Sequence, residues 1–317
     1  MSHMTIEEIR EKIRLGRQKR KDGTLRRPPP PPCDDTPPPG FSYDAAEVPE
    51  GAVDLAAGLM TAAHAFYIPS SGLVLKTGPF VRSAEAEAMR FIATHTSIPV
   101  PVVHKFYEKN GFGYILMSRA EGVMLGDVWD SLTEEKRATI ISQLKVYVDE
   151  LRQLSGDFYG KIGRLGCEDI FFRHLCVAHR LEHNKHPYGP FETRAEYNEG
   201  LVQALRNSRP PGQWSAGDEE LAARIRALKS EEKVYSHGDL HLGNIFVDEK
   251  GNITRIIDWG GAGFSIPQRD YFEAKLRGSS QKTTWNDALE LVFSENVKEN
   301  VDFFTELNIA LTKYSGF

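Results

Sequence analysis

Four short apolar runs in the first half of the chain predict a mainly antiparallel β-sheet. The runs at residues 63–68 and 73–77 are separated by a turn with Pro and Gly, and the runs at residues 102–108 and 113–118 by a turn with Asn and Gly. Each pair is typical of a β-hairpin. A stripe of apolar residues at helical spacing over residues 83–94 lies between the two pairs. We therefore expect one helix packed on an antiparallel sheet.

From about residue 131 the apolar spacing changes to that of helices. A helix over residues 131–154 is predicted by a capping box of Ser131 and Glu134. The expected buried stripes of this helix and of a later one are Ile141, Leu144, Val148 and Leu151, then Leu221, Ala222, Ile225 and Leu228. Further helical runs extend over residues 285–312. The pattern thus predicts an α+β protein with a β-rich part followed by a mostly helical part.

A third hairpin is predicted inside the helical part. Residues 245–248 and 253–257 are rich in β-branched residues and flank a turn with Gly, so we expect two antiparallel strands. In such a pair the residue before the first strand lies beside the residue after the second, which brings Asn244 next to Asp258. An amide oxygen and a carboxylate that converge in this way suit Mg²⁺, which keeps waters and takes further ligands from phosphates.

The composition is that of an ordinary globular protein. The 317 residues are enough for two lobes, and 40% are hydrophobic and 26% charged. The net charge of -5 is mild, so we expect no nucleic-acid partner. Three scattered cysteines provide no disulfide framework. We find no signal peptide and no apolar run of roughly 20 residues. We therefore expect a cytoplasmic protein without a transmembrane segment.

Residues 1–40 differ from the rest and are expected to form a flexible, basic and proline-rich arm. Nine Lys or Arg stand against four Asp or Glu between residues 4 and 27, so the remainder of the chain is clearly acidic. A capping box of Thr5 and Glu8 predicts a short helix, and two proline runs predict an extended spacer. The arm could dock on the acidic body, on a membrane surface or on another protein, or remain a solvated tail.

The residues before the third hairpin carry a second pattern. His237-Gly238-Asp239 is followed by Asn244 and, beyond the hairpin, by Asp258. This spacing resembles the kinase catalytic loop and its downstream metal-binding Asp. Because Gly238 replaces the Arg of protein kinases and Trp follows Asp258, the chain resembles the aminoglycoside phosphotransferase and choline kinase-like families, including their large fungal set.

Two simpler interpretations stand beside this resemblance. His237, Gly238 and Asp239 could form an ordinary turn with a side-chain hydrogen bond, and His237 with His241 could suggest a zinc pair. The hairpin and Asp258 argue against an ordinary turn. The cysteines have no short paired spacing and no third ligand stands nearby, which argues against zinc.

The resemblance implies a bilobal protein-kinase-like fold with a small antiparallel β-rich N-lobe and a larger, mostly helical C-lobe. It places the N-lobe at residues 41–117, the inter-lobe hinge at 118–122 and the C-lobe at 123–317, with the catalytic loop at 236–244. It implies an enzyme that moves the γ-phosphoryl group of ATP, or of another nucleoside triphosphate, to a hydroxyl of a small molecule. Mg²⁺ is the implied cofactor.

The resemblance also implies a role for individual residues. Asp239 would accept or orient the proton of the acceptor hydroxyl, and Asn244 and Asp258 would hold Mg²⁺. Asp270 matches a family position that braces the catalytic loop. The hinge residues, whose backbone would hydrogen-bond the nucleotide base, are Ser118, Arg119 and Ala120.

Lys76 lies near the end of a predicted strand, where the family has a lysine that grips the phosphates. Ser83 can cap the helix that follows, in which Glu85 shares a face with apolar residues. An unpaired carboxylate on such a face would be costly. We therefore expect an ion pair between Lys76 and Glu85, with Glu87 as the competing partner.

Two departures from the kinase pattern bear on other functions. Residues 50–63 contain only Gly51 and Gly58, where kinase-like sites often have a G-x-G-x-x-G loop. Weak triphosphate affinity, or a non-catalytic nucleotide-binding or scaffold protein, is therefore an alternative. A protein kinase is the other alternative, which is disfavoured because the chain after Asp258 has no activation segment and no A-P-E motif.

Overall fold

The computed structural model describes residues 44–57, 63–173, 188–278 and 283–314. These residues belong to one compact unit, Tyr43–Phe317. The basic arm with its capping box, and Gly58 in the glycine-poor stretch, lie outside the described residues. Within the described ranges, no helix combines the length and the apolar character that crossing a membrane requires.

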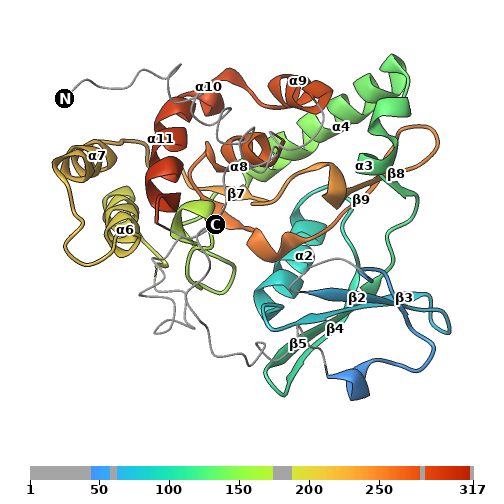
Figure 1. Cartoon of the computed structure of the whole chain (residues 1–317). Coiled ribbons are helices and arrows are strands. Elements are labelled where there is room, and N and C mark those ends of the chain that lie inside the picture. The colour runs from blue at the N-terminus through green and yellow to red at the C-terminus, as the bar shows by residue number, and fades with distance from the viewer. Residues whose placement is uncertain (1–43, 58–62, 174–187, 279–282, 315–317) are drawn as a thin grey trace, which may run out of the picture. The chain divides into compact units, whose positions relative to one another are not determined.

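The first lobe is a five-stranded antiparallel sheet in the order β1-β2-β3-β5-β4 (Figure 1). Its strands are β1 (Val53–Asp54), β2 (His64–Ile68), β3 (Leu73–Gly78), β4 (Val103–Lys109) and β5 (Phe112–Ser118). All four predicted strands are confirmed. Asn110 and Gly111 have φ angles of 51° and 82°. Two positive φ angles are what the two-residue turn between β4 and β5 requires.

The predicted helix of this lobe is α2 (Ser83–His95). Glu85 lies on its buried face together with Ala88, Met89 and Ile92, as expected. The predicted cap is wrong. Ser83 is the first helical residue, and the residue before it occupies the N-cap position without a side-chain capping hydrogen bond.

The second lobe is mostly helical. Its helices are α3 (Leu125–Val128), α4 (Glu134–Gln153), α6 (Arg194–Asn207), α7 (Ala216–Arg226), α8 (Arg269–Gly278), α9 (Thr283–Val292), α10 (Glu295–Lys298) and α11 (Val301–Thr312). One small antiparallel sheet contains β6 (Val123–Met124), β8 (Ile245–Val247) and β9 (Ile253–Ile256), and another contains β7 (Val234–Ser236) and β10 (Gly263–Ser265). A small antiparallel lobe followed by a larger helical lobe confirms the predicted α+β, kinase-like fold class.

Two details of the α4 prediction are wrong. The helix is capped by Thr133, whose hydroxyl accepts a backbone N–H at 3.3 Å. Ser131 is not available for this role because it ends a 3-10 turn, η2 (Trp129–Ser131). The buried stripe uses Ile140 in place of Ile141, whereas the other three predicted positions are buried.

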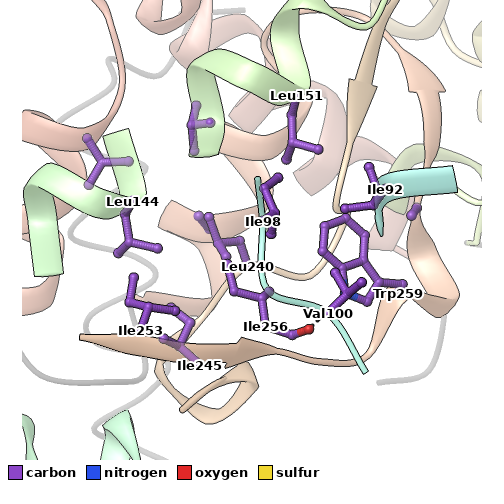
Figure 2. Packing of buried hydrophobic residues seen from close by; sticks show 14 of the residues in the cluster. Ile92, Ile98, Val100, Leu144, Leu151, Leu240, Ile245, Ile253, Ile256 and Trp259 are labelled. Carbon is purple, nitrogen blue, oxygen red and sulfur yellow. Dashed lines mark hydrogen bonds between the residues drawn. The ribbon is translucent and has the colours of Figure 1, made fainter. Parts of the chain in front are cut away.

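One apolar core extends through both lobes (Figure 2). It includes Ile92 of α2, Leu144 of α4, and Ile245 and Ile253 of the β8–β9 hairpin, and it reaches Trp259 directly after Asp258. A separate core lies among α6, α7 and α11. Because α2 and the hairpin share one packed core, the polar residues that they carry are held in a fixed relation.

Candidate active site

Lys76 on β3 joins the two lobes through two carboxylates. Its Nζ lies 2.6 Å from Glu85 Oε1 on α2 and 2.9 Å from Asp258 Oδ1 after β9. The side chains of Lys76 and Glu85 are only 14% and 5% exposed. The predicted ion pair is therefore present, and the competing Glu87 pairs with Arg90 instead.

The charges of these three residues shift their ionisation. Burial by itself would lower the pKa of Lys76, but the charges of Glu85 and Asp258 outweigh it and raise the pKa above its ordinary value. The Lys76 ammonium in turn lowers the pKa of Asp258 to about 2. Lys76 and Asp258 are therefore both charged at neutral pH.

The β8–β9 hairpin brings Asn244 to the residue before Asp258. The strands are antiparallel, and the backbone N–H of Ile257 donates to the Asn244 carbonyl at 2.9 Å. Asn244 therefore lies across the hairpin from Ile257, one position from the predicted partner Asp258. Its side-chain Nδ2 donates to the Asp239 carbonyl at 2.9 Å, which joins the hairpin to the catalytic loop.

The backbone at Asp258 adopts an unusual conformation. Its φ and ψ angles of 64° and 62° are left-handed. A non-glycine residue in this region costs of order 1–3 kcal/mol, and such strain is concentrated at functional sites. A Cβ on Gly260, in η5 (Trp259–Gly261), would lie 3.4 Å from Glu85 Oε2 and 3.5 Å from Asp258 Oδ1, which is ordinary van der Waals contact. The space at this position therefore does not by itself require glycine.

His237 fixes the predicted catalytic loop, residues 236–244, through both ring nitrogens. The Asp239 backbone N–H donates to Nδ1 at 3.1 Å, so Nδ1 carries no proton and Nε2 donates to the Ile257 carbonyl at 3.1 Å. His237 is fully buried, and burial lowers its pKa. The zinc interpretation is not supported, because both nitrogens are engaged. Moreover, the residues described contain no group of three or more His, Cys, Asp or Glu that could hold a metal.

Asp270 braces the loop as expected. Its carboxylate oxygens accept the backbone N–H groups of His237 at 3.0 Å and Gly238 at 2.8 Å. Arg269 was not identified from the sequence. Its Nη2 donates to the Gly261 carbonyl at 2.6 Å, and a Cβ on Gly238 would lie 2.3 Å from the same nitrogen. Glycine is required here because a Cβ would also lie 2.6 Å from the Gly261 carbonyl oxygen and the φ of Gly238 is 76°. The glycine itself was the only sequence signal that pointed to this close approach.

The Asp239 carboxylate faces two basic side chains that sequence reasoning missed. Arg277, near the end of α8, forms an ion pair with Oδ1, and His241 Nε2 lies 3.7 Å from the same oxygen. The Gly243 backbone N–H donates to His241 Nδ1 at 3.0 Å, so Nε2 carries the ring proton. No local pattern could have linked Arg277 to Asp239, because α8 returns to the catalytic loop only in the folded chain.

A cavity of about 470 Å³ lies between the first-lobe sheet and the β8–β9 hairpin. Its apolar walls include Ala65, Val74, Met117, Phe246 and Ile257. All the residues predicted to bind a nucleotide line it, namely Lys76, Glu85, Ser118, Arg119 and Ala120, together with Asp258. Asp239 and Asn244 are not lining residues. The volume is within the range of small-molecule sites.

Two of the predicted hinge residues, Ser118 and Arg119, make different contacts with the first lobe. The Ser118 backbone N–H donates to the Val102 carbonyl at 2.9 Å, and its Oγ accepts the Val102 N–H at 2.9 Å. The Arg119 guanidinium lies over the Tyr67 ring, 4.4 Å from its centroid. Ser118 and Arg119 are thus each held by a neighbour in the first lobe.

The sequence profile of the phosphotransferase enzyme family matches residues 70–289. The matched region contains Lys76, Asp239, Asn244 and Asp258, and it covers more than half of the chain. The chain therefore belongs to the phosphotransferase enzyme family, a family of enzymes that transfer phosphate.

Individual relatives are distant. Clavilactone A biosynthesis cluster protein Y of Ampulloclitocybe clavipes is 25% identical over 206 residues, which cover 56% of this chain and 48% of the relative. The chain thus spans about half the length of this curated relative. The structure of the streptomycin-ATP-APH(2")-IIa ternary complex is similar at 13% identity and a TM-score of 0.44, over 100% of this chain and 98% of that chain. Macrolide 2'-phosphotransferase type I is similar at 12% identity and a TM-score of 0.47, over 98% and 90% of the two chains.

Proposed function

We propose that this protein is a Mg²⁺-dependent kinase that transfers the γ-phosphoryl group of ATP to a hydroxyl of a small molecule. The observation that carries the proposal is the cavity of about 470 Å³, because the hinge residues line it together with Lys76, Glu85 and Asp258. Membership of the phosphotransferase enzyme family supports the reaction class.

The nucleotide base would lie between the sheet and the hairpin. Val74 and Met117 line the cavity from the sheet, and apolar surfaces there favour a planar ring over water. Ser118 already bonds to Val102 through both its N–H and its hydroxyl. The backbones of Arg119 and Ala120 are therefore the hinge groups that would bond the edge of the base. ATP is the first candidate, and GTP is the comparison to titrate beside it.

The phosphates would meet Lys76. Its ammonium is held in one position by Glu85 and Asp258, and its raised pKa keeps it charged. A cation that is already oriented stabilises phosphate charge without reorganisation during the reaction.

The donor set next to the hairpin fits Mg²⁺. Asn244 uses its Nδ2 on the Asp239 carbonyl, so its Oδ1 remains as the donor to a metal, and the Asp258 side chain is 44% exposed. One amide oxygen and one carboxylate leave several positions for waters and phosphate oxygens, which is typical of Mg²⁺. Asn244 and Asp258 would hold the ion, which when bound neutralises phosphate charge.

Asp239 would take the proton from the acceptor hydroxyl. As that O–H bond breaks, the oxygen forms a bond to the γ-phosphorus, and the bond from the γ-phosphorus to the β–γ bridging oxygen breaks. ADP leaves with the electron pair of that bond. Asn244 and His237 hold the backbone of Asp239 at its carbonyl and its N–H, so the carboxylate is positioned before the acceptor arrives.

We place the reaction in the cytoplasm. Cys167 is a buried free thiol whose pKa is raised by burial, which suits a reducing setting in which thiols serve as packing residues. A contact of the basic arm with a protein or a membrane surface remains a prediction from the sequence.

Two aspartate variants test the proposal. Asp258→Ala removes a proposed Mg²⁺ ligand, so it should weaken both Mg·ATP binding and turnover. Asp239→Asn keeps the shape but loses the base, so turnover should fall by about 100-fold or more while Mg·ATP binding stays near normal. Calorimetry measures binding. Mass spectrometry of pooled aminoglycosides, choline, amino alcohols, sugars and cell metabolites detects the gain of one phosphoryl group.

Glu249→Gln is the matched control, because it removes one exposed carboxylate from the turn of the same hairpin. Equal binding defects in both aspartate variants would contradict the division of roles, and an active Asp239→Asn enzyme would remove Asp239 from the mechanism. A wild-type protein that does not bind Mg·ATP would refute the proposed function. A modified protein in place of a modified metabolite would favour a protein kinase.

A further inference from the structure

Helix α8 carries an arginine to the proposed catalytic base. The first turn of the helix is fixed to the catalytic loop, because Asp270 accepts the backbone N–H groups of His237 and Gly238. About two turns further along the same helix, Arg277 forms an ion pair with Asp239 Oδ1. Helix and loop are held together, so Arg277 is a built-in neighbour of Asp239.

The two oxygens of Asp239 have different surroundings. Oδ1 has almost no contact with solvent; it faces Arg277 and lies 3.7 Å from His241 Nε2. The proton of an acceptor hydroxyl would therefore be taken by Oδ2. The Arg277 side chain is 41% exposed, so it is accessible from the solvent from which an acceptor arrives.

This arrangement places a positive charge beside the position of the reacting hydroxyl. Because Arg277 offsets the negative charge of Asp239, a cationic acceptor gains no net attraction from this pair and meets like charge on the side of the guanidinium. An anionic acceptor would meet a planar guanidinium with five N–H donors, the side chain best suited to carboxylate and phosphate oxygens.

We propose that the acceptor carries a carboxylate or a phosphate close to its reactive hydroxyl and that Arg277 binds this anionic group. The inference rests on the proposed function, because it assumes that Asp239 receives the acceptor hydroxyl. Arg277 is then the residue that determines specificity for the charge of the acceptor. Amines such as aminoglycosides and choline are disfavoured substrates.

The test compares acceptors that are matched except in charge. The probes are glucose with glucuronate and glucosamine, and glycerol with glycerate and glycerol phosphate. Their binding is followed by calorimetry, and phosphoryl transfer from ATP by ADP release. We expect kcat/KM for an anionic member to exceed that of its neutral parent by about tenfold or more, with glucosamine the poorest substrate. A preference for glucuronate and glycerate indicates a carboxylate, and one for glycerol phosphate indicates a phosphate.

Variants of α8 assign this preference to one side chain. Arg277→Met should reduce the ratio of anionic to neutral kcat/KM by about tenfold, mainly through the KM of the acceptor, and Arg277→Lys should restore part of it. Arg277→Glu should shift the preference toward glucosamine. Lys275→Met is the matched control, because Lys275 is on the same helix but pairs with Glu290 at 2.7 Å, and its loss should leave the ratio unchanged.

Anionic probes that neither bind nor react better than their neutral parents would overturn the proposal. The same loss of preference in Lys275→Met would also overturn it, since any positive charge on α8 would then suffice. Mg·ATP binding reports on the proposed function separately. If the wild type binds Mg·ATP and prefers neutral or cationic acceptors, only the role of Arg277 fails. If it does not bind Mg·ATP, the proposed function fails, and calorimetry with the probes still decides whether Arg277 binds anions.

Discussion

Replacing Lys76 with Met should destabilise the protein, because it leaves Glu85 buried without its cation. The Glu85 side chain is 5% exposed. Removing one partner of a buried ion pair costs about 3–5 kcal/mol. Two effects limit the loss here. Burial raises the pKa of Glu85, so the lone carboxyl can take up a proton, and the charge of Lys161 also acts on it. We therefore expect a loss of about 3 kcal/mol, or about 6–12 °C in Tm for a body of this size.

The double variant Lys76→Met with Glu85→Met tests the source of this loss. It removes both charges and keeps a similar volume, so it should recover most of the stability, to within about 1 kcal/mol of the wild type. Mg·ATP binding should stay impaired in the single and the double variant, because Met cannot hold phosphate. Stability and nucleotide binding should therefore respond differently to the second substitution.

Urea unfolding at neutral pH and calorimetric titration of Mg·ATP measure the two effects. Glu87→Gln with Arg90→Met is the control, because this pair on α2 is about half exposed, with side chains 50% and 42% accessible. Its removal should cost less than about 1 kcal/mol. If the double variant at Lys76 and Glu85 is as unstable as Lys76→Met alone, the unpaired carboxylate is not the cause and the reasoning fails.

Two further changes test the catalytic loop. Burial lowers the pKa of His237, so the folded state favours the neutral ring. The free energy of unfolding therefore falls as the pH drops below the unfolded-state pKa of about 6.5, by up to about 1.4 kcal/mol per pH unit. In thermal unfolding, His237→Asn should therefore lose less stability than the wild type between pH 7 and pH 5. A dependence of stability on pH equal to that of the wild type would contradict this. Gly238→Ala should cost about 3 kcal/mol or more, because its Cβ would lie 2.3 Å from Arg269 Nη2 at a φ of 76°. Gly212→Ala, at a φ of 75° with nothing within 4 Å, should cost only about 1 kcal/mol; equal losses in urea unfolding would refute the steric explanation.

The parts of the fold that the sequence predicted correctly depend on local chemistry. Turn residues and β-branched runs specify each hairpin over a few positions, and antiparallel geometry then places Asn244 across from Ile257, directly before Asp258. The Lys76–Glu85 pair was predictable for a different reason. A carboxylate on an apolar helix face is too costly to leave unpaired, and a strand with a lysine directly precedes that helix.

The wrong or missing predictions concern positions where two neighbouring residues could serve the same role, or contacts between segments that are distant in the sequence. Ser131 and Thr133 can both cap a helix, and the choice was decided by the 3-10 turn that occupies Ser131. Ile140 is buried in the place predicted for Ile141, because both positions fit a helical stripe through Leu144 and spacing alone does not distinguish them. The partners of Gly238 and Asp239 come from α8, and no periodicity in the sequence encodes such a contact.

The glycine before Asp239, the proposed catalytic base, also bears on how the proposed site is controlled. Protein kinases have Arg at this position, whereas here Gly238 leaves space for the Arg269 guanidinium. Arg269 is 1% exposed and lies 3.0 Å from Asp169 Oδ1 and 3.3 Å from Glu273 Oε1. Two buried acids already satisfy this cation, so it is not available to bind a phosphate added to another segment of the chain. The loop is therefore held by internal bonds, and the arginine that contacts Asp239 among the described residues is the partly exposed Arg277. The proposed role of Arg277 accordingly makes the charge of the acceptor the variable to test at this site.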